Sequence, residues 1–294
     1  MRPRNVTPPL VETLEPRLLL DGATYAPTPD EQYLLELLNR GRSDPAAEAA
    51  RYGTDLNEGL EPGTITTDPK QPLAWNLSLA EAARGHSQWV LDNDTFSHYG
   101  ENGSAPWDRA TDAGYPTTYV GENLAWKGTT APSFDATAWT GDLHRLLYID
   151  EGIAGRGHRV NQLDPTWKEV GCGVVTGVFT QNGTDYNSLM ITEDFGYYSA
   201  GGSFLTGVAY QDALVLSNGF YTPGEGVDGV TITATRQSDS AVFSTDTWDA
   251  GGYTLSLPDG TYDVTAWRSD FGTFALGTAP VGPDNAKVDF AYVD

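Results

Sequence analysis

The hydrophobic pattern of this chain changes period once, and that change constrains the fold more than any other feature. In the first half, apolar residues recur at helical spacing, as in Leu34–Leu38. After residue 169 they alternate, as in strands. Val170–Thr180 and Tyr186–Phe195 flank Asn182-Gly183, a pair typical of a tight hairpin turn. Helices followed by an antiparallel strand pair predict an α+β fold for residues 28–197.

Capping patterns predict where the helices begin. Thr28–Glu31 combines a capping hydroxyl, a proline at the first helical position and a glutamate at the third. Asp44-Pro45 opens a second short helix, and Ser78–Glu81 predicts a third with Ser78 as its cap. On the third helix His86 shares the apolar face, so we expect a core histidine. Further helices are expected over about residues 105–113 and, opened by Ser133, about 134–147.

A glycine-rich segment, residues 198–202, separates this region from a second one. From Ser203 onward no helical period appears, and short strands recur at near-regular spacing. The expected strands are Phe204–Tyr210, Val230–Arg236, Tyr253–Leu257, Tyr262–Trp267 and Lys287–Val293. The sequence therefore predicts two domains, residues 28–197 and 203–294, joined by the linker 198–202, with a small β-sandwich as the second domain.

The first 27 residues have the composition of a leader. They contain several prolines, and their one apolar cluster, Leu18–Leu20, is too short for the core of an ordinary secretory signal. The segment Leu14–Leu20 nevertheless resembles the LEPR-x-LL segment near the start of many large exported bacterial proteins. We expect residues 1–27 to be a disordered export segment and the protein to be secreted or held at a bacterial cell surface.

Charge excludes several classes of partner. The chain has 17 Lys and Arg against 40 Asp and Glu, a net charge of −23, which repels nucleic-acid backbones and favours divalent cations or basic partners. The alternative is an acidic surface that serves solubility. No stretch approaches the roughly 18–20 apolar residues that a transmembrane helix needs. The single cysteine, Cys172, lies in an alternating apolar run, so a buried unreactive thiol is expected.

All four histidines lie in the first domain, and three segments around them carry candidate chemistry. These segments are Phe96-Ser97-His98, Gly121–Trp126 and Gly157–Asn161. They are too far apart for spacing alone to define a site. Together with Leu73–Asn76, Glu169–Val174 and Asp194–Gly196, in this order, they resemble the CAP superfamily of cysteine-rich secretory proteins, antigen 5 and plant pathogenesis-related proteins, in its bacterial form.

The resemblance implies a three-layer α-β-α sandwich with a cleft tetrad of two histidines and two acids, which in some members binds a divalent metal. His98, Glu122 and His158 match three of the four positions. Two imidazoles and a carboxylate suit Zn²⁺ or another divalent cation. The alternative is structural: Glu122 anchors its own turn, His98 interacts with a helix C-terminus, and His158 bridges backbone groups. The residues expected to support the cleft are Asn123, Trp126, Arg159 and Asn161.

The fourth position of the tetrad departs from the family. Its members carry a glutamate three residues after a tryptophan, and here Trp139 is followed at that spacing by Asp142. Trp139, Asp142 and Leu146 share one helical face, so we expect Asp142 to point inward. Because an aspartate reaches one methylene less far than a glutamate, Glu151 is the substitute ligand to test.

The second domain resembles the prealbumin-like modules of bacterial surface proteins, in the segments Gly207–Tyr210, Gly229–Ile232 and Leu257–Tyr262. Such modules act as spacers or adhesion domains. For the whole protein the favoured function is an exported binding module whose cleft holds a metal, a small molecule, a lipid or a peptide. The alternatives are a metal-assisted hydrolase that uses the same tetrad, and a purely structural surface protein.

Overall fold

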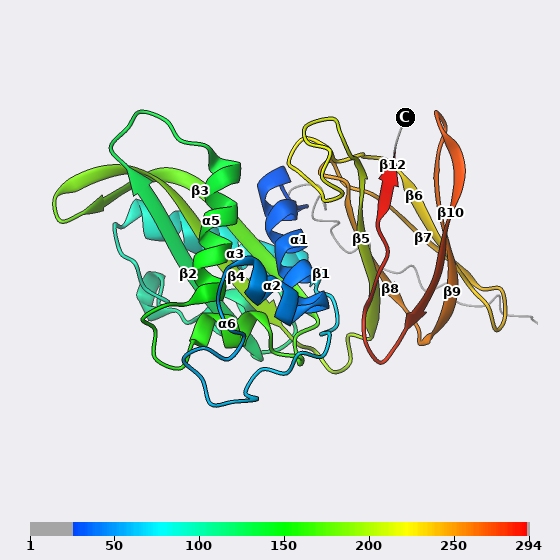
Figure 1. Cartoon of the computed structure of the whole chain (residues 1–294), viewed down its shortest axis with the longest axis horizontal. Helices are drawn as coiled ribbons and strands as arrows, with labels where there is room; N and C mark the ends of the chain where they lie inside the picture. Colours follow the sequence, from blue (N-terminus) through cyan, green and yellow to red (C-terminus); the bar gives the residue numbers. More distant parts are fainter. Residues whose placement is uncertain (1–25, 293–294) are drawn as a thin grey trace, which may run out of the picture.

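The computed structural model describes residues 26–292 and shows two domains in contact (Figure 1). The predicted export segment lies outside the described residues except for its last two. The elements of the first domain are α1 (Pro29–Ser43), α2 (Pro45–Arg51), β1 (Ala74–Trp75), α3 (Leu77–Asp92), the short 3-10 helix η1 (Glu101–Gly103), α4 (Pro106–Asp112), β2 (Val120–Thr129), α5 (Ala136–Ile149), α6 (Gly157–Gln162), β3 (Glu169–Gln181) and β4 (Thr184–Gly196).

The first domain is the predicted three-layer α-β-α sandwich, built on a sheet of order β1-β3-β4-β2. Strand β3 shows how the layers form. A Cβ added to Gly171 would lie 2.0 Å from the backbone nitrogen of Ala80, so only glycine lets α3 pack this closely on one face of the sheet. Between Gly171 and Gly173, the side chain of Cys172 points to the other face and is buried in the core that contains Leu34 of α1.

Several local predictions are confirmed, and two caps are corrected. Thr28 caps α1 in a capping box with Glu31, and Asn182 and Gly183 both adopt positive φ in the β3–β4 hairpin. The predicted cap of α3, Ser78, is wrong. The side chain of Asn76 accepts the backbone N–H groups of Ser78 and Leu79, because an Asx side chain one position before the helix reaches both. Similarly, α5 is capped by Asp135 and not by Ser133.

The second domain is the predicted β-sandwich. Its strands are β5 (Ser203–Gln211), β6 (Thr231–Arg236), β7 (Val242–Asp246), β8 (Gly252–Leu257), β9 (Gly260–Arg268), β10 (Gly272–Val281), β11 (Ala286–Lys287) and β12 (Phe290–Tyr292). One sheet has the order β10-β9-β6-β7, and the other is built on β5, which pairs with β8, β11 and β12. Strands β7 and β10, absent from the sequence prediction, lie at the two edges of the first sheet and expose most of their side chains.

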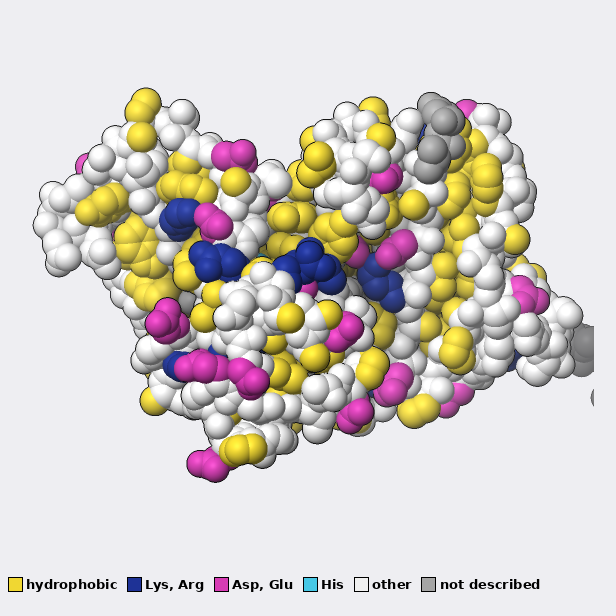
Figure 2. Space-filling model, in the orientation of Figure 1, with side chains coloured by type: hydrophobic (Ala, Val, Ile, Leu, Met, Phe, Trp, Pro, Cys, Tyr) yellow, Lys and Arg dark blue, Asp and Glu magenta, His cyan; other side chains and the backbone are white. Residues whose placement is uncertain are grey.

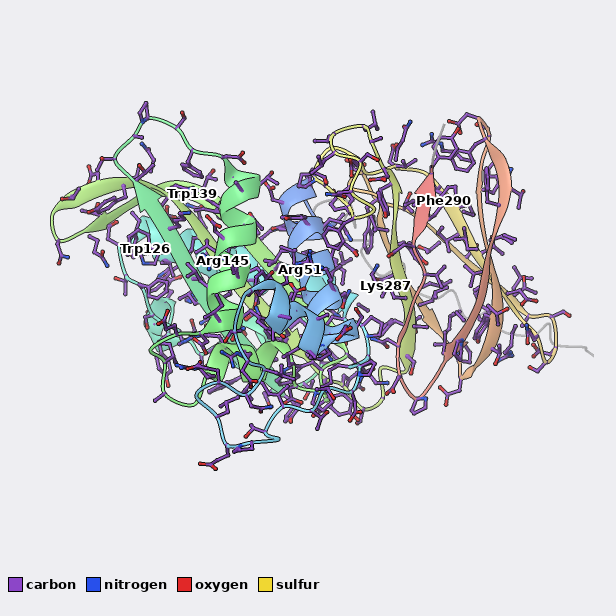
Figure 3. All side chains as sticks on the ribbon, viewed as in Figure 1. Arg51, Trp126, Trp139, Arg145, Lys287 and Phe290 are labelled. Carbon is purple, nitrogen blue, oxygen red and sulfur yellow. The ribbon has the colours of Figure 1, made fainter. Side chains whose placement is uncertain are left out.

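The two domains meet along α1, which lies between the sheet of the first domain and the sandwich (Figure 1). The Lys287 ammonium reaches Glu36 of α1 at 2.8 Å, and Figure 3 shows Lys287 between the helix and the sandwich. Near the linker, the Asn285 side chain donates to the carbonyl oxygens of Pro72 and Lys168 at 2.9 and 2.7 Å. The linker therefore joins domains that are also held together by buried polar contacts.

Replacing Lys287 by alanine should lower the free energy of unfolding of the full chain at pH 7 by ~3–5 kcal/mol, the usual cost of breaking one side of a buried ion pair. Burial raises the pKa of Glu36, and Lys287 opposes that rise. Without Lys287 the folded-state pKa of Glu36 moves further above its unfolded value of about 4.3. The loss should therefore shrink as the pH falls below about 4.3, where Glu36 becomes protonated in both states, and grow as the pH rises.

Urea unfolding of the wild type and the variant at pH 4 and pH 7 measures this difference. The double variant Lys287→Ala/Glu36→Gln is the control, and it should recover most of the stability lost at pH 7. An equal loss at both pH values would show that the ion pair is not what joins the domains.

Candidate functional site

The motif Gly121–Trp126 lies on β2, and its register against β4 sends neighbouring side chains to opposite faces of the sheet. Glu122 pairs with Asp194, and Asn123 pairs with Glu193. Because successive side chains of a strand alternate, the first pair faces α3 and the second faces the layer of α1, α5 and α6. The motif therefore contributes to two separate polar clusters. Local sequence does not reveal β2, since its buried residues are consecutive rather than alternating.

Glu122 is the centre of the first cluster, and its side chain is 1% exposed. The Nδ1 atom of His98, from the loop after α3, donates to Oε1 of Glu122 at 2.7 Å. The guanidinium of Arg109, from α4, donates through Nη2 to Oε2. Asp194 is fully buried beside them, and burial, reinforced by the charge of Glu122, raises the pKa of Asp194 well above its ordinary value.

His86 lies beside this cluster on α3 and is completely buried, as expected. Its Nε2–H donates to the carbonyl oxygen of Ser97 at 2.9 Å, and its ring stacks on Trp89 with centroids 5.8 Å apart. Burial lowers the pKa of His86, so the ring is neutral at pH 7. A neutral ring that donates through Nε2 carries a free lone pair on Nδ1.

Four buried polar atoms of this cluster lack a partner among residues 26–292: Nδ1 of His86, Nε of Arg109 and both carboxylate oxygens of Asp194. Of these residues, His86 and Arg109 line a hollow of about 480 Å³ between α3, η1 and α4, with Trp89, Gly100 and Ser104 among the other lining residues. We call it the α3–α4 hollow. A Cβ on Gly100 would lie 3.1 Å from Ser104 Oγ, 3.3 Å from His86 Nδ1 and 3.4 Å from Arg109 Nη1. Gly100 thus keeps these polar groups clear of a side chain.

Helix α3, which lines the hollow, lies behind the sheet in the view of Figure 1. Figure 2 shows the opposite face of the molecule, on which no histidine is visible. The sequence prediction included His98 and Glu122 but missed Arg109 and Asp194. Asp194 could have been found, because two adjacent acids, Glu193 and Asp194, follow soon after the apolar run Leu189–Ile191 in the same predicted strand. Arg109 is contributed by a separate helix, and no local pattern marks it.

His158 belongs to the second cluster, on the opposite side of the sheet. It lies in the first turn of α6, and Asp150 accepts both its Nδ1–H, at 2.7 Å, and its backbone N–H, at 2.9 Å. The hydrogen bond that His158 donates to Asp150 raises the pKa of His158. Asn123 donates to the carbonyl oxygen of His158 at 3.2 Å and to the buried Glu193 at 2.9 Å. The two tetrad histidines are therefore separated by the sheet.

The expectation that Asp142 points inward is wrong. Its side chain is 44% exposed and pairs with Lys127 at 2.6 Å. Helix α5 buries Leu143, His144 and Leu147. The face that meets the core therefore lies one position along from the predicted face of Asp142 and Leu146.

The remaining predicted residues have mainly structural contacts. Glu151 is exposed in the turn after α5 and, with His158, lines a second hollow. Trp126 packs against Phe179 with ring centroids 4.7 Å apart. Asn161 donates to Asn123 at 3.1 Å. Arg159 is fully buried and donates to the backbone carbonyls of Tyr148, Ile149, Asp55, Leu56 and Glu58.

This arrangement does not fit the four-ligand metal site. Within residues 26–292, no three His, Cys, Asp or Glu side chains lie close enough to hold one ion. Both oxygens of Glu122 are already hydrogen-bonded, one of them to a guanidinium that neutralises its charge. We therefore derive no chemistry through a metal.

Comparison with known proteins agrees with the fold. The family model of the cysteine-rich secretory proteins matches residues 35–192, more than half of the chain. This chain belongs to the CAP family. A carboxypeptidase regulatory-like domain matches residues 221–292, in the β-sandwich. The two matches fall within the two predicted domains.

Curated relatives of this CAP protein include two from Bacillus subtilis. The uncharacterized protein YkwD is 30% identical over 36% of this chain and 35% of its own length. The uncharacterized membrane protein YlbC is 26% identical over 37% of this chain and 28% of its own length. The chain thus matches about a third of each relative. A solved extracellular protein of Bacillus anthracis that contains an SCP domain aligns with 57% of this chain and 40% of its own, at 21% identity and a TM-score of 0.34.

None of the helices described in residues 26–292 has both the length and the apolar composition needed to cross a membrane.

Zn²⁺ titration tests the tetrad prediction directly. Because the two histidines lie on opposite sides of the sheet and Arg109 neutralises Glu122, we expect no stoichiometric Zn²⁺ binding to chelator-treated protein at pH 7.5, measured by calorimetry. The result that would contradict this arrangement is binding of one Zn²⁺ that both His98→Ala and His158→Ala abolish while His144→Ala retains it.

Proposed function

We propose that the protein is a secreted ligand-binding module and that its ligand lies in the α3–α4 hollow. One observation supports the proposal: His86 and Arg109 line the hollow, and each carries a buried polar atom, Nδ1 and Nε respectively, without a partner in the described chain. A buried polar group left without a hydrogen bond costs about 1–3 kcal/mol. Native proteins keep such groups rarely, and a ligand that completes their hydrogen bonds recovers that cost.

The two atoms specify a complementary ligand. The lone pair of His86 Nδ1 needs a donor, and the N–H at Arg109 Nε needs an acceptor. An amide group provides both at once, with its N–H and its carbonyl oxygen. The half-buried indole of Trp89 adds an aromatic wall for the apolar part of the ligand.

Binding is favoured over hydrolysis by the state of Glu122. A general base needs an accessible oxygen within reach of the proton that it takes. The Glu122 side chain is 1% exposed, and its two oxygens accept hydrogen bonds from His98 and from the Arg109 guanidinium. The pair therefore fixes Arg109 at the edge of the hollow instead of activating water.

The placement outside the cell is supported by the export-type segment Leu14–Leu20 and by membership of a secretory family. The sandwich domain then acts as the spacer or adhesion module. Its contacts with α1 give the CAP domain a defined orientation relative to that spacer.

NMR titration of the ¹⁵N-labelled full chain with acetylglycinamide, a small probe with two amides, tests the hollow. We expect saturable shifts of the Gly85 and Gly100 amides and of the Trp89 indole. Gly100→Ala should weaken binding at least about tenfold, because its methyl group would crowd His86 Nδ1. Gly100 has a φ of −98° and a ψ of −148°, so the amide spectrum of Gly100→Ala is compared with that of the wild type before the titration, to check that the variant folds.

The matched control is Gly157→Ala, where an added methyl group meets no atom within 4 Å. It should bind the probe like the wild type. The proposal fails if the shifts do not saturate, or if Gly100→Ala binds the probe as well as Gly157→Ala does.

A further inference from the structure

The rim of the α3–α4 hollow is acidic. Glu81 of α3, Glu101 of η1 and Asp112 of α4 line it, and the last two are exposed. The basic residue among the lining side chains is Arg109, whose guanidinium is bound to Glu122. The rim therefore carries uncompensated negative charge, which attracts a cationic ligand.

The buried lining residues His86 and Arg109, which we call the floor of the hollow, make a different demand. Their unpartnered atoms are an acceptor, His86 Nδ1, and a donor, Arg109 Nε. His86 is fully buried, and its ring is held by Ser97 and stacked on Trp89. The acceptor is thus fixed in place, and an occupant must satisfy both the floor and the rim.

Few ligand classes meet both demands. A polyamine offers only donors, so it leaves Arg109 Nε without an acceptor, and a carboxylate offers only acceptors and is repelled by the rim. A sugar hydroxyl can donate to His86 and accept from Arg109, but a sugar carries no positive charge for the acidic rim. A peptide has an N–H and a carbonyl oxygen at every residue, and a lysine or arginine adds the cation.

We propose that the α3–α4 hollow binds a short basic peptide, with a backbone amide on His86 and Arg109 and a lysine or arginine side chain at Glu101 and Asp112. This inference rests on the proposed function and names the ligand class of the same site. The volume of about 480 Å³ lies in the usual range of ligand sites, roughly 300–1,000 Å³.

Blocked tripeptides test the inference, with the full chain at low salt and the same NMR signals as readout. The probes are acetylated and amidated Lys-Gly-Lys, Gln-Gly-Gln and Glu-Gly-Glu, with spermidine as a cation that lacks acceptors. We expect Lys-Gly-Lys to bind about tenfold more tightly than Gln-Gly-Gln, and Glu-Gly-Glu not to bind. Spermidine should be weaker than Lys-Gly-Lys and should leave the Gly100 signal unchanged.

Charge variants locate the interaction. Glu101→Gln/Asp112→Asn should reduce the affinity for Lys-Gly-Lys about tenfold and leave that for Gln-Gly-Gln unchanged. The matched control, Glu61→Gln/Asp249→Asn, removes two exposed charges away from the hollow and should bind like the wild type. His86→Phe and Gly100→Ala should each weaken both peptides, and Gly100→Ala keeps the test valid if His86→Phe fails to fold.

The outcomes separate the two proposals. If Gln-Gly-Gln binds as tightly as Lys-Gly-Lys and Gly100→Ala weakens both, the hollow is a ligand site but the basic class is wrong. If spermidine matches Lys-Gly-Lys at the same signals, the site captures cations and the peptide is wrong. If neither the tripeptides nor acetylglycinamide shifts these signals, the proposed function is wrong as well.

Discussion

Helix α1 is buried between the two domains, and the rest of the structure depends on how its polar side chains are satisfied. Arg42 is fully buried and donates to the carbonyl oxygens of four residues, Gln71, Gln162, Asp164 and Trp167. Burial lowers its pKa to about 9. On the same helix, Glu31 binds Arg84 of α3 at 2.8 Å, and Glu36 binds Lys287 of the sandwich. One helix thus binds the loops that contain Gln71 and Asp164, helix α3 in the opposite layer, and the second domain.

The candidate site depends on this arrangement through α3. Gly171 and Gly173 let α3 approach the sheet so closely that Ser87 bonds the carbonyl oxygen of Gly173 at 3.0 Å and the Thr192 hydroxyl at 2.8 Å. His86 precedes this anchored serine, so its ring has little freedom to turn towards another partner. Because a buried polar atom without a partner costs free energy, the packing that holds His86 in place has to offset that cost.

Sequence alone predicted the parts of the fold that are encoded locally. The capping box at Thr28 and the Asn182-Gly183 turn depend on a few adjacent residues, and both were recovered. The direction of Asp142 was not, because helical spacing defines a face but does not say which face meets the core. The separation of His98 from His158 follows from the alternation of Glu122 and Asn123 on a strand that the sequence did not reveal.

The central claim is that His86 presents a fixed lone pair to a ligand in the α3–α4 hollow. The ¹⁵N chemical shifts of the imidazole nitrogens test it most directly, because they report both the tautomer and the hydrogen bonding of each ring nitrogen. We expect a neutral His86 at pH 7, protonated at Nε2 and unprotonated at Nδ1, whose Nδ1 resonance alone shifts upfield when blocked Lys-Gly-Lys is added. A ring protonated at Nδ1, or an Nδ1 resonance that saturating peptide leaves unchanged, would contradict the account.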